Sequence, residues 1–233
     1  MRIEEPVLEG RFLRRYKRVL ADVELSDGTS VTAHCPNTGS LKGCLVEGSR
    51  AILRDSQDPK RKLRYTLQAL RIGRTWVNVD TSLPNRVVYE AVLAGDLPEL
   101  EGYDEVQREV PYGESSRIDL LLVRKRSRKQ CFVEVKSTTL AEGHTARFPD
   151  AVTLRGRKHL GELVGVLAAG HRAVQLFLVS RNDVRRFAPA DAIDPAYGAA
   201  LRDAARAGVE VLAYRARVRP DRIEVHSRLP VEL

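Results

Sequence analysis

The sequence has few cysteines: only Cys35, Cys44 and Cys131 occur among its 233 residues. Their number and uneven spacing exclude the disulfide framework that stabilises many small secreted proteins. They also lack the paired short spacing of a zinc site, and no second cluster completes the tetrahedral ligand set that His34 and Cys35 would begin. We therefore expect the three cysteines to be small buried side chains.

Long apolar runs, internal repeats and low-complexity tracts are also missing from the sequence. No stretch approaches the roughly 18 consecutive apolar residues that a membrane-spanning helix requires. The first residues carry no apolar run behind their charges, so we expect no secretory signal and a cytoplasmic protein. With 43% hydrophobic and 30% charged residues, the composition is that of a folded soluble protein with one large domain or two modest ones.

The chain carries a surplus of positive charge, with a formal net charge of +8. Residues 1–83 contain 15 Lys and Arg against 10 Asp and Glu, a net charge of +5, and the remainder contains 24 against 21, a net charge of +3. A basic surplus favours the binding of polyanions through counterion release. The charge therefore permits a nucleic-acid partner without identifying one.

The first eighty residues are typical of short strands separated by turns. Ser26-Asp27-Gly28 predicts a hairpin turn, and residues 35–39 predict a tight loop. Closely spaced short strands indicate a small barrel or sandwich. The predicted strands are Val7–Leu13, Val19–Leu25, Ser30–Ala33, Arg50–Leu53, Leu63–Ile72 and Trp76–Val79.

From about Leu83 the pattern changes to alternating helices and strands, which predicts a mixed α/β layer. In the first helix, Ser82 is the expected cap, Pro84 suits the first turn and Gly95 ends the helix. The expected order is helix Pro84–Ala94, strands Val106–Pro111, Ile118–Val123 and Cys131–Lys136, helix Leu154–Ala169, strand Ala173–Val179, helix Ala196–Ala207 and strand Val209–Tyr214.

Three charged residues lie inside apolar strand segments: Asp119, Glu134 and Lys136. Residues two apart in a strand share a face, so Glu134 and Lys136 should point the same way, with Val133 and Val135 facing the core. Isolated charges in strands are costly to bury unless they are paired or bind metal. If the neighbouring strand aligns Asp119 with Glu134, two carboxylates and an ammonium group converge on one patch.

This combination suits metal-dependent phosphodiester hydrolysis. Two carboxylates suit a hard divalent cation such as Mg²⁺ or Mn²⁺, which can activate water and neutralise charge on a scissile phosphate. A lysine can orient that water and stabilise the transition state. The alternative is an ordinary Asp–Lys–Glu salt-bridge network on an exposed sheet face. The motif's position on two successive strands, after a helix and before another, favours the nuclease interpretation.

The helix–three strands–helix–strand order with Asp119 and Glu134-Val135-Lys136 resembles the PD-(D/E)xK nuclease superfamily. The chain more closely resembles the sugar fermentation stimulation protein A (SfsA) family, along nearly its whole length. The matching segments are residues 15–18 (RYKR), 34–39 (HCPNTG), 85–86 (NR), 116–119 (SRID), 134–137 (EVKS), 148–153 (FPDAVT) and 229–233 (LPVEL).

The resemblance implies an α/β (mixed α+β) protein: an OB-like, nucleic-acid-binding β-barrel at residues 1–83, followed by a PD-(D/E)xK nuclease-like domain at residues 84–233. The family is described as binding DNA without sequence preference and is also named as a DNA/RNA nuclease. The superfamily usually places a further glutamate on its first helix, and Glu90 is the candidate third metal ligand. Its alternative is a solvated helix carboxylate.

Two groups of basic residues are candidates for nucleic-acid binding. Arg155, Lys158 and His159 open the second long helix, where backbone N–H groups also favour anions. Arg155 and His159 are four residues apart and share a helix face. In the barrel, the candidates for a basic groove with an aromatic ring are Arg15, Tyr16, Lys17 and Arg18. For both groups, solvated surface residues or packing residues are the alternative.

The sequence thus predicts a Mg²⁺- or Mn²⁺-dependent nuclease. Asp119 and Glu134 would bind metal with Glu90, and Lys136 would assist the attacking water. The alternative is a non-enzymatic, sequence-nonspecific DNA-binding regulatory protein, which gains nothing from carboxylates facing phosphate. DNA and RNA are the candidate partners, and no membrane is expected. The residues do not discriminate DNA from RNA, single strand from duplex, endonuclease from exonuclease, or one oligomeric state from another.

Overall fold

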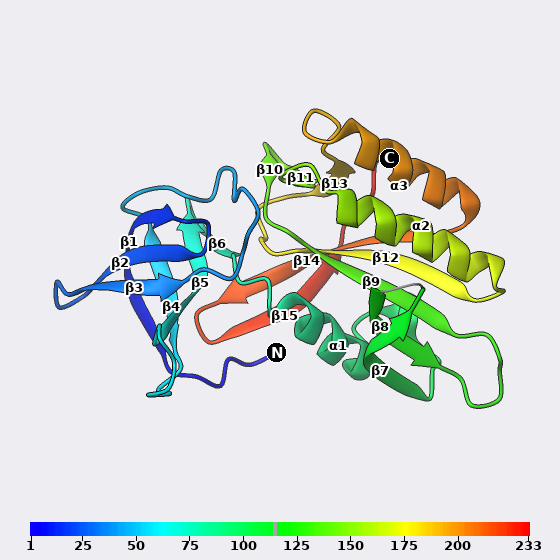
Figure 1. Ribbon diagram of the computed structural model, residues 1–233, viewed down its shortest axis with the longest axis horizontal. Coiled ribbons are helices and arrows are strands. Elements are labelled where there is room, and N and C mark those ends of the chain that lie inside the picture. Colours follow the sequence, from blue (N-terminus) through cyan, green and yellow to red (C-terminus); the bar gives the residue numbers. More distant parts are fainter. Residues whose placement is uncertain (114–115) are drawn as a thin grey trace.

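The structure is a computed structural model that describes residues 1–113 and 116–233. A β-barrel formed by the first strands lies beside a larger unit of sheet and helices (Figure 1). None of the helices in these residues is long and apolar enough to cross a membrane.

The barrel is a six-stranded sheet with the order β3-β2-β1-β4-β5-β6, closed by an additional pairing of β3 with β5. Apolar residues such as Phe12 and Val23 fill its interior. Gly28 has a φ of 82° in the turn between β2 and β3, a conformation that glycine adopts without steric cost, so the predicted hairpin is confirmed. The strands are β1 (Val7–Tyr16), β2 (Leu20–Leu25), β3 (Ser30–His34), β4 (Arg50–Asp55), β5 (Tyr65–Ile72) and β6 (Thr75–Asn78).

The larger unit contains a second six-stranded sheet with the order β15-β14-β12-β9-β8-β7. Strand β12 is parallel to β9 and β14, and the other neighbours are antiparallel. A small sheet, β10-β11-β13, lies beside it. The elements are α1 (Pro84–Ala94), the 3₁₀ turn η1 (Pro98–Leu100), β7 (Glu105–Tyr112), β8 (Ser116–Val123), β9 (Cys131–Thr138), β10 (Ala141–Glu142), β11 (Thr145–Phe148), α2 (Leu154–Ala168), β12 (Arg172–Val179), β13 (Arg186–Pro189), α3 (Pro195–Ala207), β14 (Glu210–Arg219) and β15 (Arg222–Arg228).

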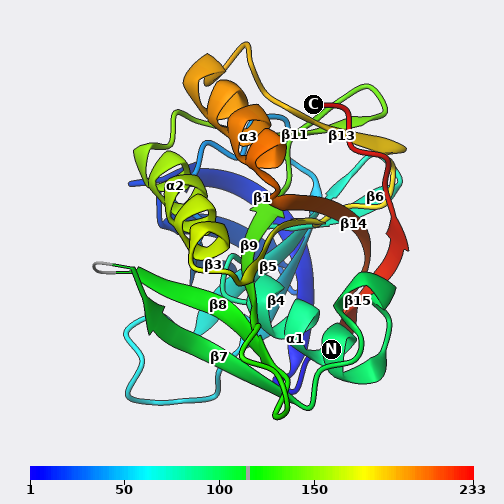
Figure 2. The same ribbon diagram turned by 90° about the vertical axis from the view of Figure 1, so that its right-hand side faces the viewer.

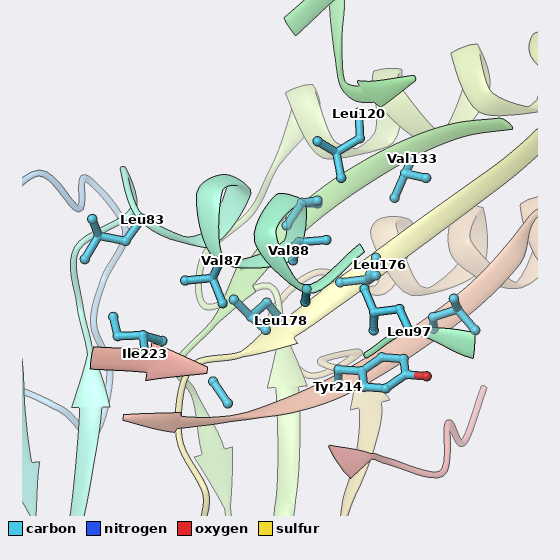
Figure 3. Close-up of a cluster of buried hydrophobic side chains, with 14 of the residues drawn as sticks. Leu83, Val87, Val88, Leu97, Leu120, Val133, Leu176, Leu178, Tyr214 and Ile223 are labelled. Carbon is cyan, nitrogen blue, oxygen red and sulfur yellow. The ribbon is translucent and has the colours of Figure 1, made fainter. Parts of the chain in front are cut away.

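Helices cover both faces of the second sheet, with α2 and α3 on one side and α1 on the other (Figure 2). Val87 and Val88 of α1 pack with Val133 and Leu176 of the central strands (Figure 3). On the opposite face, Leu160 and Leu163 of α2 belong to a second apolar cluster. Because both faces are covered, β12 is apolar along most of its length and buried except at its first residue, as expected for a central parallel strand.

The predicted elements all occur in the predicted order, but four further strands were not predicted and one predicted cap was wrong. Strands β10, β11 and β13 are only two to four residues long, too short to produce a clear alternation, and β15 has only one buried residue. Ser82 does not cap α1, because its N–H and hydroxyl both donate to Asp80 Oδ1, and Leu83 stands at the N-cap. Pro84 and Gly95 do lie at the two ends of α1.

The two units share a continuous interface. Ile52 and Ala69 of the barrel belong to the same apolar cluster as α1 and the central strands, and Asn78 N–H donates to Ser180 O at 2.9 Å. At the start of the chain, Ile3 N–H donates to the carbonyl of Asp221 at 2.8 Å, so the N-terminus lies against β15 (Figure 1). The first residues therefore pack on the larger unit, because their backbone extends the pairing of its edge.

Candidate functional site

Strands β8 and β9 separate where the three motif residues lie. Their pairing covers Leu122↔Cys131 to Leu120↔Val133 and ends there. Two residues further along β9, Val135 N–H donates to the carboxylate of Asp119 (Oδ2, 2.7 Å) instead of to a strand carbonyl. The side chain of Asp119 thus replaces part of the strand ladder, and a cleft opens between the two strands.

Glu134 and Lys136 share one face of β9, and Asp119 lines the same cavity of about 260 Å³. Val133 and Val135 point to the opposite face, into the cluster with α1. Lys136 Nζ lies 2.5 Å from Glu134 Oε1. The structure therefore brings the three predicted residues together in one cleft, and their action on a substrate stays a prediction.

Glu134 is nearly inaccessible, with an exposed fraction of 2%. Its Oε1 accepts hydrogen bonds from Lys136 Nζ and His159 Nδ1, whereas no described residue donates to its buried Oε2. Burial alone would raise the pKa of Glu134, but the contacts with His159 and Lys136 outweigh it and lower the pKa. One carboxylate oxygen is thus held by cations and donors, while the other has an unused lone-pair site.

Asp119 has the opposite electrostatic environment. Burial, followed by the nearby charge of Glu134, raises the pKa of Asp119 to about 7. Two close carboxylates in a buried site resist ionising together, so one pKa rises and the other stays low. This crowding of negative charge is the condition that a bound cation relieves.

Asn85 and Glu90 belong to the same helix but face different surroundings. Asn85 Nδ2 in the first turn of α1 donates to Asp119 Oδ1 at 2.6 Å. Glu90 instead contacts Arg86 Nε at 2.9 Å and the N-terminal ammonium group of Met1 at 3.2 Å. Five residues rotate a helix by roughly 140° beyond a full turn. The expectation of Glu90 as a third ligand is therefore not met in this geometry.

Two of the basic residues predicted on α2 line the mouth of the cleft. Arg155 and Lys158 border a cavity of about 380 Å³ together with Asp119 and Glu134. His159 also borders this cavity but has an exposed fraction of only 4%. Arg155 Nε donates to His159 Nε2 at 3.3 Å, so the proton of a neutral His159 ring lies on Nδ1 and is donated to Glu134. The sequence predicted that His159 contacts a phosphate. In the structure His159 instead positions Glu134, because the first turns of α2 pack against β9.

The predicted basic group of the barrel is divided between two roles. Arg15 donates to the carbonyls of Asn37 and Gly39, and Tyr16 donates its hydroxyl to Asp22 at 3.2 Å. Lys17 and Arg18 are exposed at the turn between β1 and β2. Arg15 thus holds the loop after β3, while Lys17 and Arg18 stay candidates for phosphate contact.

Sequence reasoning missed two residues of the cleft, Asn85 and Glu109. Asn85 Nδ2 lies 3.4 Å from Glu109 Oε1, and Glu109 lines the cavity with Asp119 and Glu134. Glu109 has a φ of 53°, unusual for a residue other than glycine. Asn85 lies in a segment that matches the SfsA family, but nothing in the sequence gave either residue a role, since both reach the site from elements that only the fold brings near.

The residues of the cleft fit a divalent cation held by two carboxylates. In the described part of the chain, no three His, Cys, Asp or Glu side chains are arranged to hold a metal ion. Mg²⁺ is commonly bound through one or two carboxylates while it keeps several waters. The unpartnered Glu134 Oε2 and the raised pKa of Asp119 both indicate that Lys136 does not fully balance the negative charge of the two carboxylates.

Comparison with known proteins covers nearly the whole chain. Residues 13–79 match the family model of the SfsA N-terminal OB domain, and residues 82–222 match that of the sugar fermentation stimulation protein RE domain. The sugar fermentation stimulation protein homolog of Geotalea uraniireducens (strain Rf4) is 52% identical over 233 residues and covers 100% of both chains. The homolog from Pelobacter propionicus is 53% identical over 228 residues and covers 98% of each chain.

A solved structure is similar over the same length. Pyrococcus furiosus SfsA in complex with Ca²⁺ superimposes with a TM-score of 0.89 and 30% identity, covering 100% of this chain and 98% of that one. The mixed α+β architecture, with an N-terminal OB domain and a sheet-rich C-terminal domain, is thereby confirmed. The division of the chain at residue 83 stays a prediction.

Proposed function

The chain belongs to the sugar fermentation stimulation protein A family, and from this premise we propose that it is a divalent-metal-dependent nuclease acting on DNA or RNA with little sequence preference. The observation that carries the proposal is Glu134. It is a buried carboxylate with one oxygen held by Lys136 and His159 and the other unpartnered beside Asp119. A salt-bridge network on an exposed sheet face would be open to water and would leave no buried oxygen without a donor.

Asp119 and Glu134 would hold the cation. The related Pyrococcus furiosus SfsA is in complex with Ca²⁺, and we propose Mg²⁺ or Mn²⁺ for this chain. The cation would supply positive charge to the attacking water and to the scissile phosphate. Asn85 orients Asp119 through its amide, and His159 orients Glu134. The two carboxylates are thus fixed before substrate arrives, which lowers the cost of organising the site.

Lys136 would act on the water and on the phosphate. Its ammonium group has three N–H donors, and the contact at 2.5 Å with Glu134 Oε1 uses one of them. The remaining donors can orient a water or stabilise charge that develops on a phosphate oxygen. Arg155 and Lys158 at the mouth of the cleft would contact neighbouring phosphates.

The proposal is tested by incubating the purified chain with labelled single- and double-stranded DNA and RNA, in the presence of Mg²⁺, Mn²⁺, Ca²⁺ or EDTA. We expect cleavage that EDTA abolishes. Lys136→Ala should lower kcat by about a hundredfold or more, the usual effect of removing one group that stabilises developing charge. Its affinity for nucleic acid should change little, because one lysine contributes little to the total attraction of 39 Lys and Arg residues.

Lys125→Ala is the matched control, since Lys125 is an exposed lysine in the loop between β8 and β9. It should cleave as fast as the wild type. Salt-sensitive binding without cleavage under every metal condition would reject the nuclease and favour the non-enzymatic DNA-binding protein. Equal loss of binding and cleavage in Lys136→Ala would assign that lysine a structural role.

A further inference from the structure

A third cavity, of about 300 Å³, lies between the OB domain and the sheet-rich domain. Asn37, Thr38 and Gly39, in the loop after β3, form its wall on the barrel side. Its opposite wall includes Asn85 of α1, Lys136 of β9, Phe148 of β11 and Asp150 after β11. Neither domain forms this cavity alone.

The barrel loop is held firmly against the other domain. Ser40 Oγ donates to Asp150 O at 2.7 Å, and Leu41 N–H donates to Asp150 Oδ2 at 2.9 Å. A Cβ added at Gly39 would lie 2.9 Å from both carboxylate oxygens of Asp150, so a larger residue there would displace that carboxylate. Arg15 fixes the loop from the barrel side through the carbonyls of Asn37 and Gly39. The cavity is therefore a built feature of the fold.

The cavity is continuous with the cleft that contains Asp119 and Glu134. Asn85, Lys136 and Phe148 line both spaces. A group bound in the interdomain cavity would therefore lie next to Lys136. If a phosphate of a nucleic-acid strand lies in the cleft, this group would be the neighbouring nucleotide of that strand. The position is that of a nucleotide adjacent to the scissile bond.

The lining offers polar and aromatic contacts for a nucleoside beside the cationic side chains of Lys136 and Arg147. Asn37 Oδ1 accepts from Gly39 N–H at 2.8 Å, and within the described chain no group accepts from its Nδ2. The exposed Thr38 adds a hydroxyl and Phe148 adds an aromatic ring. The carboxylate of Asp150 would repel a phosphate but can accept from a base amino group, as acidic side chains do with cytosine. A volume of about 300 Å³ is at the lower end for small-molecule sites.

The rim of the cleft carries two exposed apolar side chains beside the same path. Val152 and Leu154 are 67% and 71% exposed, and they flank Thr153, which lines the cleft. Proteins that separate stacked bases use such apolar side chains as wedges. An unstacked nucleotide in the interdomain cavity would leave a base step open at this rim.

We propose that the interdomain cavity receives one unpaired nucleotide next to the scissile phosphate, so that the chain acts on single strands, ends and unpaired positions in preference to continuous duplex. This inference rests on the proposed nuclease function. A base inside a duplex reaches such a cavity only after unpairing and unstacking, which costs a few kcal/mol. Discrimination of about tenfold or more in kcat/KM against continuous duplex follows from that cost.

The test compares one labelled sequence as a single strand, as a continuous duplex and as a duplex with one unpaired nucleotide. Thr38→Trp fills the cavity with a large side chain, and Thr29→Trp is its matched control on the exposed hairpin between β2 and β3. Cleavage and equilibrium binding by fluorescence anisotropy are both measured on the full chain. Thermal melts verify that both variants are folded.

We expect the wild type and Thr29→Trp to prefer the two unpaired substrates by about tenfold or more. Thr38→Trp should lose most of that preference while it retains residual activity on duplex. Equal rates on all three substrates would overturn the inference and leave the nuclease proposal intact. If no substrate is cleaved, the nuclease proposal fails. The ratio of the affinity for the unpaired substrates to the affinity for continuous duplex then decides the inference. Competition by a free mononucleotide, without any preference among the strands, would show a mononucleotide site instead.

Discussion

The chemistry of the cleft depends on the different charged partners of two neighbouring buried carboxylates. Glu134 is stabilised as an anion by His159 and Lys136, whereas Asp119 has its pKa raised to about 7 by burial and by the charge of Glu134. Only Asp119 is therefore protonated in part near neutral pH. A cation that binds both carboxylates must displace this proton, so binding and protonation compete.

We predict that the affinity for Mg²⁺ or Mn²⁺ rises about tenfold between pH 6 and pH 8, because one proton at Asp119 is displaced. Without metal, the raised pKa stabilises the fold below the unfolded value near 3.8, and this contribution is lost as pH rises through about 7. The stabilisation by metal should therefore be larger at pH 8 than at pH 6. Thermal melts with and without millimolar metal at the two pH values measure both effects.

Asp119→Asn is the control for this prediction, since it keeps the shape of the side chain and removes the titrating charge. The metal-free variant should melt at or slightly above the wild-type temperature above pH 7, and its response to metal should be small. A wild type that shows no shift with metal, together with a variant that melts far lower, would identify Asp119 as a salt-bridge partner.

At the scale of the helix, the first turn of α1 faces the cleft, and its later turns face the N-terminus of the chain. Asn85 reaches Asp119, while Glu90 is engaged by Arg86 and the N-terminus. The superfamily pattern implied an acidic ligand on this helix, and the amide of Asn85 occupies the nearest position. The helix thus contributes a donor that orients a ligand.

We predict that Asn85→Ala lowers kcat or the metal affinity by about 10- to 100-fold, the usual effect of losing a residue that orients a metal ligand. Glu90→Gln, on the same helix, should leave both values unchanged. Steady-state rates at several metal concentrations separate the two quantities. A large loss of metal affinity in Glu90→Gln, with none in Asn85→Ala, would restore Glu90 as the ligand.

At the scale of the molecule, residues 1–83 contribute a net charge of +5 and the remainder +3. Lys17 and Arg18 are exposed at the turn between β1 and β2, whereas Arg15 is used to hold the interdomain loop. The barrel therefore contributes both a wall of the proposed nucleotide cavity and exposed charge for phosphates.

We predict that binding to single-stranded nucleic acid weakens steeply with salt, and that Lys17→Asn with Arg18→Asn reduces the slope of log K against log salt by about 1.4. Asparagine is chosen because the two residues have φ values of 48° and 62°, which it tolerates. Lys125→Asn with Lys129→Asn, in the loop between β8 and β9 (Figure 1), is the control and should leave the slope unchanged. The same slope in the wild type and both double variants would show that the turn between β1 and β2 does not contact nucleic acid.

The sequence alone was sufficient for the succession of long elements and for the three central residues of the cleft. Apolar alternation and turn residues predict β1 to β6, and the charges at Asp119, Glu134 and Lys136 stand out because each interrupts an apolar strand. Side-chain direction alternates along a strand whatever the fold, so the shared face of Glu134 and Lys136 follows from local geometry. Family resemblance supplied the OB domain, which its family model confirms.

Only the tertiary structure decided which residues complete the cleft. Asn85 and His159 meet Asp119 and Glu134 from two helices on opposite faces of the sheet, and the loop at residues 37–39 reaches Lys136 from another domain. Such contacts join positions far apart in the chain, and they depend on how helices rotate and domains pack. Periodicity reports which face of an element is apolar, but it carries no information about which polar side chain lies opposite.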